Sequence, residues 1–121
     1  MALILVIEDM PDSAELAAKI LRNYGHEVFI AENGERGLSL AQEHGPDLIV
    51  YDFWLPDIDA GVFLKRLRSI EGLERVPILA CTAAPSVALQ PGQEQRGFDG
   101  LIQKPYRLSD FMKAVEEHLA K

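Results

Sequence analysis

The stretch DLIVYD, Asp47–Asp52, decides the fold class of this chain. Its central residues are apolar or aromatic at successive positions, which is typical of a parallel-sheet strand that is covered on both faces. The run LILVI, Leu3–Ile7, has the same character and is followed directly by Glu8 and Asp9. We therefore expect two buried parallel strands, Leu3–Ile7 and Asp47–Tyr51, each of which leads into acidic residues.

Three further short runs with strand character lie at Val28–Ala31, Val76–Cys81 and Gly100–Gln103. Apolar residues between the strands recur at helical spacing, and the last helix is expected from Arg107 to Ala120. Because parallel strands need right-handed crossovers, this alternation predicts an α/β fold, a doubly wound five-stranded parallel sheet flanked by five helices. The fourth helix, within 85–96, is expected to be short or irregular because Pro91-Gly92 interrupts it.

The expected helices are amphipathic. Leu16 follows the apolar spacing of the first helix, Val62 that of the third and Leu108 that of the last. Apolar residues at this spacing form one face of a helix, and that face normally packs on the sheet. We therefore expect all three side chains to be buried.

Composition and charge limit the classes of protein to which the chain can belong. Its 121 residues make one domain, 1–121. The 12 basic and 19 acidic residues give a net charge of −7, which disfavours direct binding of nucleic acid or of an anionic membrane. The single cysteine, Cys81, excludes an intramolecular disulfide. No apolar run approaches the ~18 residues of a membrane span, and the start lacks a basic leader, so we expect a cytoplasmic protein.

Residues suited to phosphate or metal chemistry follow most of the expected strands. Glu8 and Asp9 follow the first, Asp52 the third, Thr82 the fourth and Lys104 the fifth. Ligands of doubly wound sheets bind outside the carboxyl ends of the strands, so these side chains are the ones to consider for function. Three converging carboxylates repel one another unless a cation relieves the repulsion, and Mg²⁺ prefers such oxygen ligands.

An aspartate beside such an ion can attack phosphorus and form an acyl phosphate. Asp52 is the candidate nucleophile, because it stands alone at the end of a central strand. The charge on the transferred phosphoryl group must be balanced, and Lys104 offers an ammonium group for this purpose. The Thr82 hydroxyl offers a hydrogen-bond donor to another phosphoryl oxygen.

Taken together, these segments resemble the receiver domain of two-component response regulators. The resemblance covers about residues 3–119. It is carried by Ile7-Glu8-Asp9, Asp47–Asp52, Leu55–Asp59, Val76–Ala83, Gly97–Gly100 and Lys104-Pro105. Each motif alone is weak, but all of them in this order and at these separations are highly specific. The resemblance implies a flavodoxin-like sheet with the strand order 2-1-3-4-5.

The resemblance also implies a function. A histidine kinase or histidine phosphotransfer protein would donate a phosphoryl group to Asp52, and the domain would then control a downstream protein effector. In this role the chain is a phosphoacceptor that acts only on its own side chain, not an enzyme with a separate substrate. No direct contact with nucleic acid or membrane is implied.

Specific ligands follow from the resemblance as well. Mg²⁺ would be held by Asp9, Asp52 and the backbone carbonyl of Trp54, with Glu8 acting through water. Thr82 and Lys104 would contact the phosphoryl group. A cis peptide bond before Pro105 would aim the lysine.

The chain departs from the family pattern at three places. Leu101 stands where the family often has an aromatic residue, which turns inward on phosphorylation. The loop after the nucleophile has Ala60-Gly61 where glycine usually comes one position earlier. Trp54, at a variable family position, brings an indole large enough to cover the phosphoryl group and hinder the attacking water.

The same residues bear on three alternative functions. A pseudo-receiver, an interaction module of this fold without regulation by phosphorylation, is the main alternative, and Leu101 gives it weight. A nucleotide- or flavin-binding enzyme is disfavoured because the glycine-rich phosphate motifs are missing and Glu8-Asp9 would repel a phosphate. A hydrolase with an aspartate nucleophile usually has a second acid two residues on, where this chain has Trp54.

Overall fold

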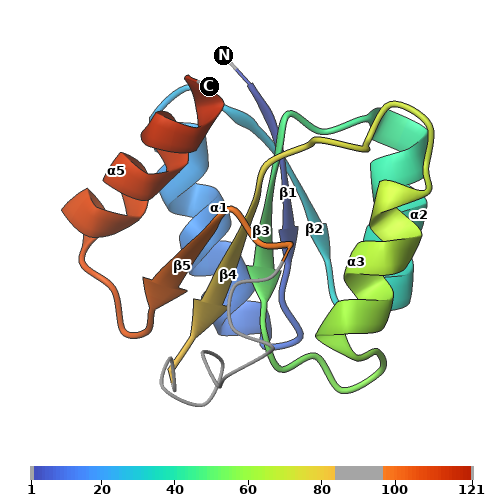
Figure 1. Cartoon of the computed structure of the whole chain (residues 1–121). Helices are drawn as coiled ribbons and strands as arrows, with labels where there is room; N and C mark the ends of the chain where they lie inside the picture. The colour runs from blue at the N-terminus through green and yellow to red at the C-terminus, as the bar shows by residue number, and fades with distance from the viewer. Residues whose placement is uncertain (1, 84–96, 121) are drawn as a thin grey trace.

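A single parallel sheet is the centre of the fold in the computed structural model, which describes residues 2–83 and 97–120. Its strands have the order β2-β1-β3-β4-β5, which confirms the predicted order (Figure 1). The strands are β1 Leu3–Ile7, β2 Glu27–Ala31, β3 Leu48–Asp52, β4 Ile78–Thr82 and β5 Gly100–Gln103. The chain turns back past β1 to form β3, so the switch in strand order lies between the two strands that end in acidic residues.

Helices cover both faces of the sheet. They are α1 Pro11–Asn23, α2 Gly34–His44, α3 Ala60–Arg68 and α5 Leu108–Leu119. One face carries α1 and α5, and the other carries α2 and α3 (Figure 1). The described residues thus contain four helices rather than the expected five. The segment expected to form the remaining helix, 85–96, lies outside the described residues.

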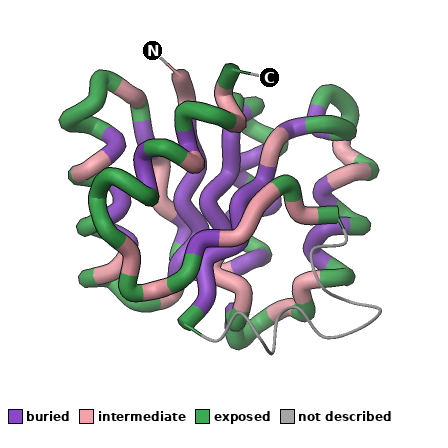
Figure 2. The backbone as a smooth tube through the Cα atoms, turned by 60° about the vertical axis from the view of Figure 1, so that its left-hand side comes forward, coloured by how far each residue is buried: buried purple, intermediate pink, exposed green. Residues whose placement is uncertain are grey.

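The sheet separates two apolar cores, and its central strands are buried along their length (Figure 2). Successive side chains of a strand point to opposite faces. In β3, for example, Tyr51 packs on the α2/α3 side and Val50 on the α1/α5 side. Burying one such side chain contributes roughly 1.5–3 kcal/mol, so the two cores hold the strand ends firmly in place.

Two strands are shifted toward their carboxyl ends relative to the prediction. β3 begins at Leu48, and Asp47, just before it, accepts a hydrogen bond on its side chain from the backbone N–H of Leu3 at 2.8 Å. β4 begins after Pro77, which has no N–H to donate to a neighbouring strand. Both strands also extend one residue further than predicted, so Asp52 and Thr82 are the last residues of their strands.

The expectation that Leu16, Val62 and Leu108 are buried was wrong. These side chains are 54%, 49% and 51% exposed, respectively. On α1 the buried positions are mostly alanines, so the helix lies close to the sheet and Leu16 falls outside the contact. Val62 and Leu108 lie in the first turns of α3 and α5, where the first large buried side chains are instead Phe63 and Phe111.

The start of α2 is capped from a distant loop. The Asp57 carboxylate accepts hydrogen bonds from the backbone N–H groups of Gly34 at 2.9 Å and Glu35 at 3.0 Å. The Asn33 side chain accepts another from Arg36 at 2.8 Å. Partial burial of Asp57 acts to raise its pKa, but the two backbone hydrogen bonds outweigh it and the pKa lies below its usual value.

Replacing this distant cap is expected to destabilise the fold. Asp57→Ala should lower the free energy of unfolding at neutral pH by about 1 kcal/mol, the usual effect of losing a helix cap. Because the folded-state pKa of Asp57 is lowered, its contribution is present above the ordinary carboxyl pKa and is lost as the pH falls through the lowered value. Urea denaturation at neutral and acid pH measures both effects. Asp110→Ala, in the first turn of α5, is the control and should change little.

Candidate functional site

Three carboxylates meet at the switch in strand order. Glu8 and Asp9 follow β1, and Asp52 ends the neighbouring strand β3. One oxygen from each side chain lies within 4.8 Å of the others. Glu8 is buried, whereas Asp9 and Asp52 are partly exposed. The structure thus brings together the acidic residues that the sequence analysis grouped.

Asp52 lies in an environment that disfavours its charge. Burial raises its pKa, the hydrogen bond and negative charge of Glu8 and the contact with Asp9 raise it further, and Lys104 lowers it in part. The net effect raises the pKa of Asp52 from its ordinary value of 3.8 to about 7. A positive charge bound at this point would relieve the repulsion and favour the ionised, nucleophilic carboxylate.

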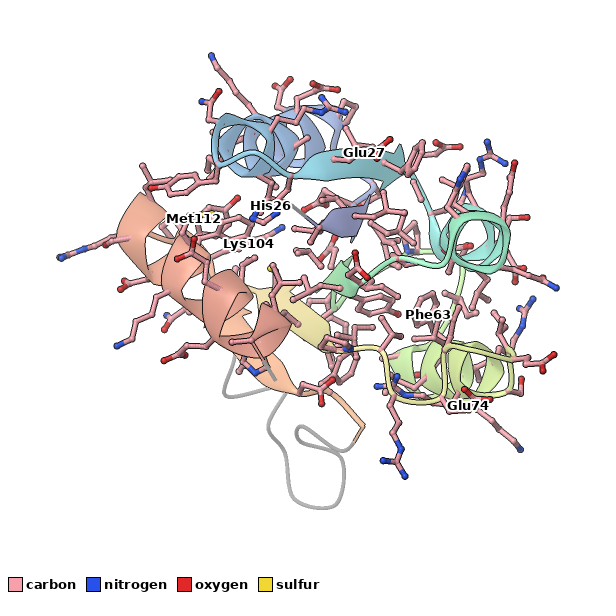
Figure 3. All side chains as sticks on the ribbon, turned by 90° about the horizontal axis from the view of Figure 1, so that it is seen from above. His26, Glu27, Phe63, Glu74, Lys104 and Met112 are labelled. Carbon is pink, nitrogen blue, oxygen red and sulfur yellow. The ribbon has the colours of Figure 1, made fainter. Side chains whose placement is uncertain are left out.

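Lys104 reaches the cluster from the end of β5. Its ammonium Nζ lies 2.5 Å from Glu8 Oε1, and its backbone N–H donates to the Thr82 carbonyl at 2.8 Å. Burial acts to lower the pKa of Lys104, but the hydrogen bond and charge of Glu8, with Asp52, outweigh it and the pKa is raised. The Lys104–Pro105 peptide bond is cis, as the resemblance implied. Figure 3 labels Lys104 on the α5 side of the sheet and Phe63 on the α3 side.

Both oxygens of Glu8 have partners within the protein. Oε1 faces Lys104, and Oε2 accepts a hydrogen bond from the backbone N–H of Met10 at 3.2 Å. Asp9 and Asp52 are the more accessible carboxylates. The geometry therefore suits Glu8 for an indirect role and leaves the other two as direct oxygen donors.

The donor set fits Mg²⁺. The ion binds hard oxygen ligands at about 2.1 Å, keeps several waters and needs only one or two carboxylates. Carboxylate oxygens within 4.8 Å of one another can share such an ion with small side-chain movements. Lys104 lowers the pKa of Asp52 only in part, so an added cation would further favour the ionised carboxylate.

Trp54 lies beside the site, in the loop that follows β3. Its backbone N–H donates to Asp52 Oδ1 at 3.4 Å, and its indole Nε1 donates to Thr82 Oγ1 at 3.2 Å. The ring packs edge-on against Phe53, with centroids 4.8 Å apart. The sequence pointed to a bulky cover at this position, but no pattern in it indicated the bond to Thr82.

This cover predicts slow hydrolysis of a phosphoryl group on Asp52. Trp54→Asn should shorten the lifetime of the phosphorylated protein severalfold, because water reaches the acyl phosphate more easily. Loss of label after removal of the phosphodonor gives the lifetime. Tyr24→Asn is the matched control, since Tyr24 is 51% exposed and Trp54 54%. An unchanged or longer lifetime in Trp54→Asn would contradict the covering role.

The altered loop after the nucleophile forms a regular helix start. Asp59 caps α3 by accepting hydrogen bonds from the backbone N–H groups of Gly61 at 2.9 Å and Val62 at 3.4 Å. The displaced glycine is the second residue of that helix, after Ala60. The departure from the family pattern therefore leaves a normally capped helix beside the site.

An apolar cavity of about 310 Å³ adjoins the acidic cluster on the α1/α5 side. Leu16 and Ala17 of α1 line it, together with Tyr106 and Phe111, which stack with centroids 4.6 Å apart. Glu8, Asp52 and Lys104 form its polar end. No pattern in the sequence indicates this cavity, because its walls come from segments far apart in the chain.

Residues 4–116 match the family model of the response regulator receiver domain. The chain belongs to this family. One relative of this receiver domain is the polar-differentiation response regulator DivK of Brucella anthropi, which is 28% identical over 116 residues, 96% of this chain and 94% of DivK. The predicted family membership is therefore confirmed.

Two solved receiver structures show the same fold. The receiver domain of sensor histidine kinase PA1611 from Pseudomonas aeruginosa, which has a magnesium ion in its active-site cleft, is 28% identical with a TM-score of 0.87, covering 99% of this chain and 98% of that one. The chemotaxis response regulator CheY4 of Vibrio cholerae is 26% identical, also with a TM-score of 0.87, covering 97% of this chain and 98% of CheY4. Within the part of the receiver domain that the structure describes, no helix is long and apolar enough to cross a bilayer.

Proposed function

We propose that this receiver domain accepts a phosphoryl group on Asp52, from a histidine kinase or a histidine phosphotransfer protein, and thereby controls a downstream protein. The observation that carries the proposal is the convergence of Asp52 with Glu8, Asp9 and Lys104 at the carboxyl edge of the sheet. This edge, at the switch in strand order, is where doubly wound folds bind their ligands.

The transfer balances without a further reactant. One carboxylate oxygen of Asp52 forms a bond to phosphorus while the bond from phosphorus to the partner's imidazole nitrogen breaks. The electron pair of that bond leaves with the nitrogen, and the imidazole, which carries a proton on its other ring nitrogen during the transfer, leaves as neutral imidazole. The product is an acyl phosphate on Asp52, so the receiver domain changes only its own side chain and acts on no separate substrate.

Charge balance is the main task of the surrounding residues. Asp9, Asp52 and the Trp54 carbonyl would hold Mg²⁺, with Glu8 acting through water; the bound ion supplies positive charge to the phosphoryl oxygens. The magnesium ion of the PA1611 receiver domain supports this assignment. Lys104 supplies a second positive charge, and Glu8 keeps its ammonium beside the site before the phosphoryl group arrives. Thr82 supplies a hydroxyl donor.

The surface around the site suits a protein partner. Met10, Leu16 and Leu108 are more than half exposed, and all lie on segments that follow β1 or β5 at the carboxyl edge of the sheet. Exposed apolar side chains around a polar site are typical of a surface that is covered by another protein. We also infer a cytoplasmic location, which suits the free thiol of Cys81.

Labelling with a small phosphodonor tests the proposed function. The protein is incubated with acetyl phosphate and Mg²⁺, and its intact mass is measured with and without EDTA. We expect a gain of one phosphoryl group that requires the metal. A folded protein that gains no mass from acetyl phosphate or phosphoramidate would overturn the proposal and favour the pseudo-receiver.

A further inference from the structure

We propose that Trp54 senses the state of Asp52 through Thr82. In the unphosphorylated protein the indole N–H holds the Thr82 hydroxyl, and phosphorylation draws the hydroxyl away from the indole. This inference rests on the proposed function, because it concerns how a phosphoryl group on Asp52 is communicated to the surface.

The contact joins a buried strand end to an exposed ring. Thr82 is 1% exposed at the end of β4, whereas Trp54 is 54% exposed in the loop after β3. The indole has a single hydrogen-bond donor, and that donor points inward to Thr82 Oγ1 at 3.2 Å rather than to solvent. A change in the position of Thr82 therefore changes the partner of a surface side chain.

Asp52 and Thr82 face opposite sides of the sheet. Asp52 and Cys81 are register partners on adjacent strands, and both line the cavity on the α1/α5 side. Because successive side chains alternate along a strand, Thr82 points to the α2/α3 side. Ile78, four residues earlier in β4, belongs to the core on that side.

Because of this geometry, a phosphoryl group on Asp52 and the indole of Trp54 compete for the Thr82 hydroxyl. The Thr82 hydroxyl can accept a hydrogen bond from the indole N–H and at the same time donate its own proton to a phosphoryl oxygen. The indole and the phosphoryl group therefore do not compete for the same hydrogen-bonding direction of the hydroxyl. They do need different positions of that oxygen. To meet a phosphoryl group on Asp52, Oγ1 must turn toward the α1/α5 side of the sheet edge, away from Nε1 of Trp54.

The aromatic side chain that contacts Thr82 comes from the loop after β3, not from β5. Leu101, at the family's aromatic position, pairs with Ala80 in the β4–β5 register and carries no ring. Trp54 reaches Thr82 from the other side, where its ring is braced edge-on by Phe53. In this chain an aromatic next to the nucleophile can thus follow the movement of Thr82.

The single tryptophan makes the contact directly observable. With ¹⁵N-labelled tryptophan, the protein gives one indole N–H signal. We expect this signal in Thr82→Val to lie upfield of wild type, because valine keeps the shape of threonine but offers no acceptor. Adding acetyl phosphate and Mg²⁺ should move the wild-type signal toward the position in Thr82→Val, and should move the Thr82→Val signal much less.

Rates provide a second measurement. Trp54→Phe keeps an aromatic ring at this position but removes the indole N–H, so Thr82 loses its hydrogen bond from residue 54. Losing one hydrogen bond of ordinary strength predicts phosphorylation by acetyl phosphate about two- to tenfold faster. The lifetime of the acyl phosphate should stay close to that of wild type, because the ring still covers the site. Tyr24→Phe, at the far end of α1, is the control and should change neither rate.

The indole signals test the Trp54–Thr82 contact, and the mass gain tests phosphorylation of Asp52. Coincident indole signals in unphosphorylated wild type and Thr82→Val would show that the bond does not hold in solution and would overturn the inference. A mass gain of one phosphoryl group with no movement of the wild-type indole signal would also overturn it, while leaving the proposed function intact. No mass gain in wild type would overturn the proposed function, and the inference with it, even if the two indole signals differ.

Discussion

Asp52→Asn is expected to lose labelling by acetyl phosphate almost completely, by on the order of a thousandfold or more, which is typical of removing a nucleophile. The carboxamide is a poor nucleophile toward phosphorus. Glu8 does not replace Asp52, because both of its oxygens already have partners in Lys104 and Met10. Intact mass after a fixed time with the phosphodonor measures the loss. Substantial labelling of Asp52→Asn at another carboxylate would contradict the assignment of Asp52.

The same variant is expected to be more stable than wild type when metal is absent. The folded-state pKa of Asp52 is about 7, above its ordinary value of 3.8, so the folded protein binds a proton more tightly than the unfolded chain. Stability of the wild type therefore falls as the pH rises from about 4 to about 7, and the full penalty is present above that range. Because Asp52→Asn has no such charge, it should be more stable by on the order of 1 kcal/mol at pH 8 and similar to wild type at pH 4.

Urea denaturation in EDTA at the two pH values measures this difference. Asp47→Asn is the control, since Asp47 lies at the opposite end of β3, where its side chain accepts a hydrogen bond from Leu3. If Asp52→Asn gained no stability at pH 8, the repulsion within the acidic cluster would be much weaker than the structure indicates.

Loss of magnesium binding in Asp9→Asn is the second large expected effect. The variant removes one negative charge and one strong oxygen donor from the proposed ion site, so the Mg²⁺ dissociation constant should rise at least about tenfold. Phosphorylation by acetyl phosphate should then need correspondingly more Mg²⁺. Calorimetric titration gives the Mg²⁺ dissociation constant. The phosphorylation rate at several Mg²⁺ concentrations gives the concentration of the ion that the reaction needs.

Asp12→Asn is the matched control for this experiment. It makes the same change in net charge three residues away, in the exposed first turn of α1. The control separates loss of a ligand from a general weakening of the negative field. Equal weakening in both variants would contradict a direct role of Asp9 in holding the ion.

The sheet and its acidic edge were predictable from the sequence because they depend on local patterns. Buried parallel strands are continuously apolar, as Leu3–Ile7 is, and the residue that follows such a strand necessarily reaches the carboxyl edge of the sheet. The convergence of Glu8, Asp9 and Asp52 follows from the order of β1 and β3. The order itself came from the family resemblance rather than from the strands.

Contacts between distant segments were not predictable in the same way. Helical spacing placed Leu16 and Leu108 on buried faces, but spacing does not show how closely a helix approaches the sheet or where its first turn projects. Arg68 is another example: its guanidinium donates to the carbonyls of Leu73 at 3.2 Å and Val76 at 2.7 Å. Nothing in the sequence distinguishes this arginine from its basic neighbours on α3.

The remote cap of α2 limits how this receiver domain can be engineered. Asp57 fixes the far end of the segment that begins at Asp52, while its carboxylate holds the first turn of α2, the helix next to α3 on the same face of the sheet. The intervening residues, 53–56, therefore have a fixed length to span. An epitope or sensor sequence inserted there would break the hydrogen bonds of Asp57 to α2 and would also disturb Asp52. Insertions and fusions are therefore better placed far from this segment.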